Sequence, residues 1–464
     1  METVNQMTDF NPQSLSQLDR DRLRSYSRNL DFYNGAHWQE RSRYRQLVFN
    51  YAKIAIDKLT SYLMEGLNFA CEPVDDSDQA KDTARRAEQV IYQVYHDNNL
   101  QQLDYETEVD AAILGDGCYK VTWDAQEKRI RITSPDVNGL YAWCLGDDLS
   151  RIWRVASRYT LTRDEVELLY QRKITRTTAA ITELWSSGRF TLYLDNQPIE
   201  DKPNPYGFIP FVIFPNLRQP KQFWGISDIP PLMEAQRELN RALTQLSRIL
   251  EVSGNPIAVL EGVASAEDIR VQPGAVWTLP EDARAYLLDL LQGGGIRLHI
   301  DYIELIYRCL HDISEAPRAA YGGIERELSG VALEVELQSL LQKVRRKRTI
   351  RTAAYTRRNQ MVLALHKMFN REDLTPVSHR VIWGAVLPQD RARLAQNEQL
   401  LVQSGVHARR TAMDELGIRD PELEFSRWLE ERRQIMQMNQ ELRARSSRGG
   451  ERERALAAEP EPTE

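Results

Sequence analysis

Three clusters of carboxylates are the residues of this sequence best suited to chemistry: Asp75-Asp76-Ser77-Asp78, Asp147-Asp148 and Glu281-Asp282. Paired carboxylates can hold Mg²⁺ ions, and two such ions can activate water for the hydrolysis of nucleic acids. All three clusters fall in predicted turns, where solvated acidic residues are common. Surface acids are therefore the favoured interpretation, and a metal-dependent nucleic-acid-processing enzyme is kept as an alternative.

The motifs of common enzyme classes are missing from the sequence. It contains no GxxxxGK[ST] phosphate loop, no GxGxxG, no HExxH and no GxSxG, each of which sets amides, metal ligands or a nucleophile at a fixed spacing. His299 and His311 lie twelve residues apart, and the four cysteines form no CxxC pair, so neither set has the spacing of a metal site. We expect a protein that is not an enzyme, with no catalytic residue, metal or cofactor.

A basic run is the most conspicuous charge feature. It has no acidic residue from position 343 to 358 and begins with five cations: Lys343, Arg345, Arg346, Lys347 and Arg348. On a helix these positions surround most of the circumference. They are candidates for contact with DNA phosphates or with another subunit, and a solvated helix is an equally good interpretation.

Composition limits the other classes of function. The 464 residues carry a formal net charge of −7, which argues against a protein that coats nucleic acid with its whole surface. Arginine supplies 49 of the 60 basic residues and suits interface ion pairs. The N-terminus lacks the pattern of a secretory signal, and the longest apolar uncharged stretch, about 206–217, is shorter than the roughly 20 residues of a membrane span. We expect no membrane association and a reducing compartment.

Periodicity predicts an α+β, predominantly helical chain. The N-terminal region has helical spacing around residues 47–63 and 83–114. Short strands are predicted after it, ending in a proline-rich linker at 202–207 that is a candidate boundary: 118–123, 129–133, 140–145, 152–159, 181–185 and 190–194.

A long helical hairpin is predicted over residues 230–316. Pro230-Pro231 opens its first helix, and Leu239, Leu243 and Leu246 fall on one face. Glycines and prolines then punctuate short apolar runs at 257–260, 276–279 and 286–291, which predict a small β-rich knob. A second helix, 296–315, returns with Ile300 and Ile303 on its apolar face.

Further helices are predicted after the hairpin. Ser329 can cap a helix of about forty residues, kinked at some point. Helices are also predicted at 389–404, at a capping box beginning with Thr411, and after Asp420-Pro421. Residues 446–464 have no periodicity and are predicted to be disordered.

The order of these segments resembles the portal proteins of tailed bacteriophages, in particular the Gram-positive siphophage portal family. Each matching segment is short, and their shared order carries the resemblance over most of the chain. The segments are Phe32-Tyr33-Asn34-Gly35, Ile113-Leu114-Gly115-Asp116-Gly117-Cys118-Tyr119, Gly225-Ile226-Ser227-Asp228-Ile229, Ser329-Gly330-Val331-Ala332-Leu333 and Thr411 to Glu424.

The resemblance implies an organisation in named parts. It implies a ring-forming subunit in which the hairpin is the stem, its knob the clip, and the loop after it the tunnel loop. The implied divisions are a wing at 1–224, stem helices at 225–252 and 296–316, a clip at 253–295, a tunnel loop at 317–328, a long wing helix and return at 329–384, a crown at 385–445 and a disordered tail at 446–464.

The resemblance also implies a function. The ring, of about twelve copies, would form the channel at one capsid vertex through which double-stranded DNA is packaged and ejected. The DNA contact would be weak and independent of sequence, because strong ion pairing would slow the DNA. The other implied partners are the terminase large subunit, the head-to-tail connector and the major capsid or scaffolding protein. The location would be the virion, and the host cytoplasm during assembly. A helical scaffold that forms no ring is a further alternative.

Three groups of residues follow as expected sites. The tunnel loop would face DNA through Tyr321, Gly322, Gly323, Ile324, Glu325 and Arg326. The stem would pack through Leu239, Leu243, Leu246, Ile300 and Ile303, and the clip would dock its partners through Glu261, Asp268, Arg270, Glu281 and Asp282.

Overall fold

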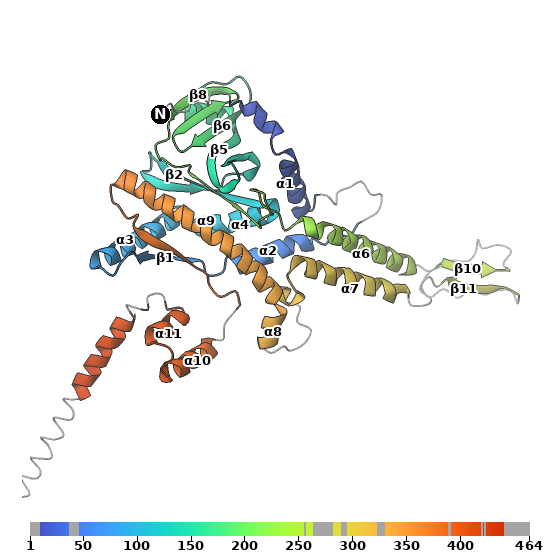
Figure 1. Ribbon diagram of the computed structural model, residues 1–464. Coiled ribbons are helices and arrows are strands. Elements are labelled where there is room, and N and C mark those ends of the chain that lie inside the picture. The colour runs from blue at the N-terminus through green and yellow to red at the C-terminus, as the bar shows by residue number, and fades with distance from the viewer. Residues whose placement is uncertain are drawn as a thin grey trace, which may run out of the picture. The chain divides into compact units, whose positions relative to one another are not determined.

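The computed structural model describes residues 10–36, 46–254, 257–262, 282–288, 295–322, 330–387, 391–418, 421 and 424–439. The chain divides into two compact units, Met1–Val386 and Leu387–Glu464. Every strand of the described residues lies in the first unit (Figure 1). The expected mixed fold with predominant helix is confirmed.

The first unit begins with helices. These are the 3-10 helix η1 (Pro12–Gln17), α1 (Arg20–Tyr33), α2 (Tyr51–Leu63), α3 (Asp78–Asp97) and α4 (Leu100–Leu114). Ser77 caps α3, since its Oγ accepts a hydrogen bond from the amide of Ala80 at 3.2 Å. The single helix predicted over 83–114 is wrong, because Asn99 adopts a left-handed conformation with φ of 49° and separates α3 from α4.

Antiparallel sheets follow the helices. One sheet has the order β3-β2-β9, a five-stranded sheet has the order β4-β5-β6-β7-β8, and β1 pairs with β12. The strands are β1 (Asn68–Pro73), β2 (Asp116–Asp124), β3 (Arg129–Thr133), β4 (Leu140–Leu145), β5 (Asp148–Thr162), β6 (Thr178–Ser186), β7 (Arg189–Leu194), β8 (Gln197–Pro203), β9 (Phe211–Pro215) and β12 (Val377–Ile382). Two more short elements accompany them: η3 (Val137–Gly139) and the helix α5 (Arg163–Tyr170).

The six predicted strands before the linker are confirmed, and four others in this unit are new: β1, β8, β9 and β12. β8 is an exposed edge strand with two prolines, which hid it from a pattern search. β9 pairs with β2 from Asp116↔Pro215 to Lys120↔Phe211. The linker at 202–207 therefore joins two sheets within one compact unit, and its interpretation as a boundary is wrong.

A long helix passes through the core of the first unit. α8 (Gly330–Glu336) and α9 (Gln338–Asn370) follow one another with a break at Leu337, where φ is −83° and ψ is 2°. The predicted kinked helix is confirmed over these residues, and Ser329 lies outside the described residues. Tyr355 of α9 is fully buried and packs its ring 5.9 Å from that of Phe69 and 6.1 Å from that of Tyr119.

Charged side chains of α9 are buried beside these aromatic rings. The Arg351 guanidinium bonds both carboxylate oxygens of Glu108, at 2.7 and 2.9 Å. Arg358 pairs with Asp104, and all four side chains have no solvent exposure. Such pairs offset the large cost of burying charge only when both partners are present.

The hairpin has nearly the predicted bounds. It consists of η4 (Pro230–Leu232), α6 (Met233–Gly254), β10 (Ile257–Glu261), β11 (Arg284–Leu288) and α7 (Gly295–Ser314). α6 and α7 lie side by side, and the antiparallel pair β10-β11 stands at their far ends (Figure 1). The predicted knob is confirmed for these two strands, while residues 276–279 lie outside the described residues.

The second unit is helical where the structure describes it. It contains α10 (Arg391–Gln403), α11 (Arg409–Glu415) and a helix at 424–439. The cap residue of α11 is Ala408, which has no side-chain cap, so the prediction that Thr411 begins this helix is wrong. No helix of the described residues combines the length and the apolar character that a membrane crossing requires.

The buried pair Arg358–Asp104 predicts a marked loss of stability when one partner is removed. We expect Arg358→Met to lower the free energy of unfolding by about 3–5 kcal/mol, because Asp104 would remain charged and buried. Urea unfolding followed by tryptophan fluorescence measures the change. The exposed pair between Lys367 of the same helix and Asp373, which follows the helix, supplies the control, since Lys367→Ala should leave the midpoint nearly unchanged.

A double variant separates the effect of the unpaired Asp104 charge from the effect of the changed side-chain shape. Arg358→Met combined with Asp104→Leu removes both charges and should be more stable than Arg358→Met alone. A double variant less stable than the single one would show that shape, and not the unpaired carboxylate, determines the loss.

Candidate functional site

The base of the hairpin is fixed by a buried carboxylate. Asp228 precedes η4, and its Oδ1 lies 2.9 Å from the Lys343 ammonium. Its Oδ2 accepts hydrogen bonds from Lys347 and, at 3.0 Å, from the side-chain amide of Asn216. The backbone amide of Asp228 donates to the carbonyl of Ala112 at 2.9 Å. These bonds attach the start of the first hairpin helix to α9, α4 and the segment after β9.

Lys343 also attaches the second hairpin helix. Its Nζ donates to the carbonyl oxygen of Ser314, the last residue of α7, at 2.9 Å. One turn along α9, Arg346 bonds Glu315 at 2.5 Å. Lys343 therefore holds both legs of the hairpin at once, one through Asp228 and the other through Ser314. We call Asp228, Lys343, Lys347, Asn216 and Ser314 the stem junction.

The charges of the stem junction stabilise one another. Burial alone would raise the pKa of Asp228, but Lys347 and Lys343 outweigh it and hold that pKa well below its usual range. Burial lowers the pKa of Lys347 to about 8, against the opposing effect of Asp228. Because the folded-state pKa of Asp228 is depressed, its stabilising contribution is complete above about pH 4 and is lost as the pH falls further.

Apolar side chains join the two hairpin helices. Leu239 and Ala242 of α6 are buried against Ile306 of α7, and Leu243 and Ile303 pack on this cluster. Leu246 is half-buried, while Ile300 is 43 % exposed. Of the five residues expected to pack in the stem, Leu239, Leu243 and Ile303 thus belong to the interior of one subunit's own hairpin.

A polar face of α6 binds the segment before α2 and the first turn of α2. The side chains of Thr244, Asn240 and Gln236 accept hydrogen bonds from the backbone amides of residues 47, 49 and 52 at 3.1, 3.0 and 3.1 Å. We call this set of bonds the polar ladder. Sequence reasoning missed it, although three polar residues at a spacing of four on an otherwise apolar helix edge were visible.

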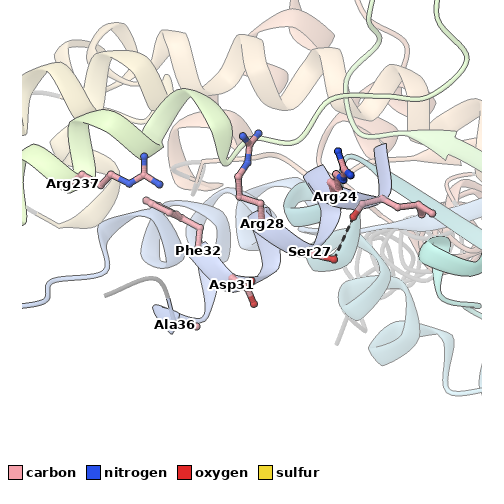
Figure 2. Close-up of a pocket in the computed structure, with 8 residues that line it drawn as sticks. Arg24, Ser27, Arg28, Asp31, Phe32, Ala36 and Arg237 are labelled. Atoms are coloured by element: carbon pink, nitrogen blue, oxygen red, sulfur yellow. Dashed lines mark hydrogen bonds between the residues drawn. The ribbon is translucent and has the colours of Figure 1, made fainter. Parts of the chain in front are cut away.

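A surface hollow lies between α1 and the base of α6. It has a volume of about 650 Å³ and is lined by Arg24, Arg28, Phe32 and Arg237, among others. Figure 2 shows Arg24 and Arg28 on one side of α1 and Asp31 on the other. Arg237 comes from α6 and pairs with Glu234 at 2.6 Å. This open basic hollow suits acidic groups of a partner more than a small-molecule substrate.

Comparison with known families decides the identity. A family model described as phage portal protein, SPP1 Gp6-like, matches residues 15–438, nearly the whole chain. The chain belongs to this portal protein family. No curated protein matches it. The resemblance drawn from the order of the segments is thereby confirmed.

Family membership gives the function. The protein is a bacteriophage portal subunit and serves in the DNA-packaging channel of the capsid. Portal proteins are structural and not catalytic, and they assemble in a ring at a capsid vertex, where terminase and connector proteins interact with them. The expectation of a non-catalytic protein agrees with this membership.

The acidic clusters lie at exposed turns where the structure describes them. Asp75 accepts a hydrogen bond from the Ser77 amide at 2.9 Å, and Asp148 accepts one from the Ser150 amide at 2.9 Å. These local bonds lower the pKa of both carboxyls. Among the described residues, no group of three or more His, Cys, Asp or Glu side chains is arranged to hold a metal ion.

The basic run of this portal subunit is largely internal. Lys343, Lys347 and Arg348 are at most 9 % exposed. Arg348 donates to the carbonyl oxygens of Leu63 at 3.1 Å and Gly384 at 2.7 Å. Their partners lie inside the fold, so these three side chains are not exposed for contact with DNA or another subunit in the described subunit. Arg345 and Arg346 are exposed.

The segment expected to be the tunnel loop is described over its first part. η5 (Arg318–Tyr321) follows α7, and Gly322 has φ of 84°, which favours glycine. The Tyr321 ring packs 5.0 Å from that of His311, whose Nδ1 lies 2.8 Å from the Ala316 carbonyl oxygen. Four expected residues lie outside the described residues: Gly323, Ile324, Glu325 and Arg326.

The expected clip residues are described in part. Glu261 and Asp282 are exposed, and the Tyr286 hydroxyl donates to Glu261 Oε1 at 3.2 Å. Asp268, Arg270 and Glu281 lie outside the described residues.

The stem junction predicts different effects for its two lysines. We expect Lys343→Met and Lys347→Met each to cost about 2 kcal/mol, since each removes a hydrogen bond to a buried charge. Only Lys343→Met should speed amide hydrogen exchange in the last turn of α7, because Lys347 bonds Asp228 and Asn216 but not Ser314. Hydrogen exchange with mass spectrometry measures this. Equal acceleration in α7 for both variants would contradict the double attachment through Lys343.

Proposed function

We propose that this portal subunit forms a closed ring of about twelve copies whose channel is lined in part by the α6–α7 hairpin. The hairpin would be the stem, the β10-β11 pair the core of the clip, the segment 317–328 the tunnel loop, residues 1–224 with 329–384 the wing, and residues 385–445 the crown. In this arrangement double-stranded DNA passes through the ring during packaging and ejection.

One observation supports the proposal above all others. A two-helix hairpin with a small sheet at its end is attached at both legs to the long helix through Lys343. Two helices alone cannot bury all of their apolar surface. Neighbouring copies of the same hairpin would complete the packing, and the rigid base would keep the helices aligned around a common axis.

Charge supports weak contact with DNA. The net charge of −7 and the burial of Lys343, Lys347 and Arg348 leave few cations of this run for phosphate. Arg345 and Arg346 remain exposed, and Arg346 pairs with Glu315 just before the segment 317–328. Contact through a few such groups would let DNA of any sequence move, since each added ion pair strengthens binding.

The tip of the hairpin would dock the protein partners. Tyr286 is 47 % exposed on β11 and donates to Glu261, and exposed aromatic side chains are enriched at protein interfaces. The terminase large subunit would bind there during packaging and the head-to-tail connector afterwards. The major capsid or scaffolding protein would contact the wing, in the host cytoplasm during assembly.

Electron microscopy of the purified protein in negative stain tests the ring. We expect round particles with a central hole, and a mass of about twelve subunits by light scattering. A mass near one subunit at every concentration would overturn the proposal and favour a helical scaffold.

The interior of the hairpin predicts the effect of charged substitutions. Leu239→Asp combined with Leu243→Asp should abolish rings, because buried carboxylates would separate α6 from α7. Mass photometry counts the rings. The control is Gln245→Glu, an exposed position on the same helix, which should leave the rings intact. Intact rings from the double leucine variant would contradict a stem built on this cluster.

A further inference from the structure

α7 carries a second apolar stripe that is largely exposed in the described subunit. Leu298, Tyr302 and Leu305 are 73 %, 43 % and 54 % exposed. Their spacing of four and three residues places them on one side of the helix, and Cys309, also exposed, continues the line by a further four. We call these four residues the outer stripe. Scattered exposed leucines are ordinary, but an aligned row on one helix marks a contact surface.

The outer stripe is distinct from the face that binds α6. Ile303, Ile306 and Leu310 of α7 lie toward the interior of the subunit, roughly a third of a turn from the outer stripe. Tyr302 marks the edge between the two faces, since its hydroxyl donates to Glu238 of α6 at 2.8 Å. One subunit therefore satisfies only one of the two apolar faces of α7.

The outward face of α6 has the chemistry to cover this stripe. Arg237, Arg241 and Arg248 recur at spacings of four and seven, so they share one side of α6, opposite Leu239. Arginine stems cover apolar surface while their guanidinium groups reach acids. Arg237 and Arg241 pair with Glu234 and Glu238 at 2.6 and 2.7 Å on the surface, and such exposed pairs exchange partners at little cost.

Acidic residues lie beside the outer stripe, where they could pair with the arginines of a second α6. Asp301 and Asp312 of α7 lie along one side of it, and neither forms an ion pair with another described residue. Their carboxylates would meet the guanidinium groups of a helix laid along the stripe. α6 and α7 have nearly equal lengths, 22 and 20 residues, so the contact would extend about 30 Å.

We infer that the outer stripe of α7 is covered by the arginine-bearing face of α6 from a second copy of this chain. The inference rests on the proposed ring and names the surfaces by which neighbouring stems meet. Each copy offers both surfaces, one on each helix, so the contact is head-to-tail and repeats around a closed ring.

The natural thiol of Cys309 tests this inference without any substitution. Of the four cysteines, Cys309 alone is exposed, while Cys71 and Cys118 are buried and Cys144 is half-buried. We expect maleimide to label Cys309 at least tenfold more slowly in purified rings than in subunits dissociated under non-denaturing conditions. Mass spectrometry identifies the labelled residue. Equal rates in rings and subunits would overturn the inference while leaving the ring itself established.

Substitution of the outer stripe gives an independent test. Leu298→Asp combined with Leu305→Asp should shift the equilibrium from rings to subunits by at least tenfold, with the helical circular dichroism unchanged. The matched control is Leu168→Asp with Leu169→Asp on α5, which are 80 % and 60 % exposed and should not change the equilibrium. Rings of undiminished stability from the outer-stripe variant would refute the proposed contact.

A charge exchange identifies the covering helix. Arg241→Glu should weaken the ring, and adding Asp301→Arg should restore at least part of the loss, because the pair would be re-formed with reversed signs across two copies. No restoration would exclude this pairing of α6 with α7.

Protection of Cys309 in capsids but not in isolated rings would assign the stripe to another virion protein and overturn the inference. Absence of any ring in the wild type would instead refute the proposed function.

Discussion

The pairing of buried cations on α9 with acids from distant segments is the constraint on which the first unit depends. Asp104 and Glu108 of α4 meet Arg358 and Arg351, and Asp228 meets Lys343 and Lys347. A buried charge without its partner costs several kcal/mol. Only one placement of α9 satisfies all of these groups together, so the same placement sets the base of the hairpin. The placement of α9 and of the hairpin base is therefore determined by buried ion pairs as much as by apolar packing.

The sequence predicted those elements whose signals are local. Pro230-Pro231 and the spacing of Leu239 and Leu243 located α6 almost to the residue, because helix starts and helical periodicity are short-range patterns. β8 was not predicted, because an exposed edge strand needs no alternation of apolar and polar residues. Asn99 separates α3 from α4 through its left-handed conformation, and no neighbouring residue predicts this break.

The candidate site was predicted less completely than the fold. The basic run from Lys343 to Arg348 was visible, but its acids and carbonyl oxygens lie 29 or more positions away in Asp228, Leu63, Gly384 and Ser314. A charge pattern along the chain does not reveal whether its counter-charges are internal. Cations that suggested a surface for DNA are therefore structural, and a channel protein that must release DNA is left with few of them outside.

The polar ladder has a mechanical consequence. Thr244, Asn240 and Gln236 each accept a hydrogen bond from a backbone amide of the segment before α2 or of its first turn, at regular intervals along the axis of α6. A pull along that axis loads all of the bonds in parallel, so they must break together. A sideways pull would open them one after another. If the hairpin is the stem proposed above and moving DNA drags on it, this shear geometry resists the force in its strongest direction.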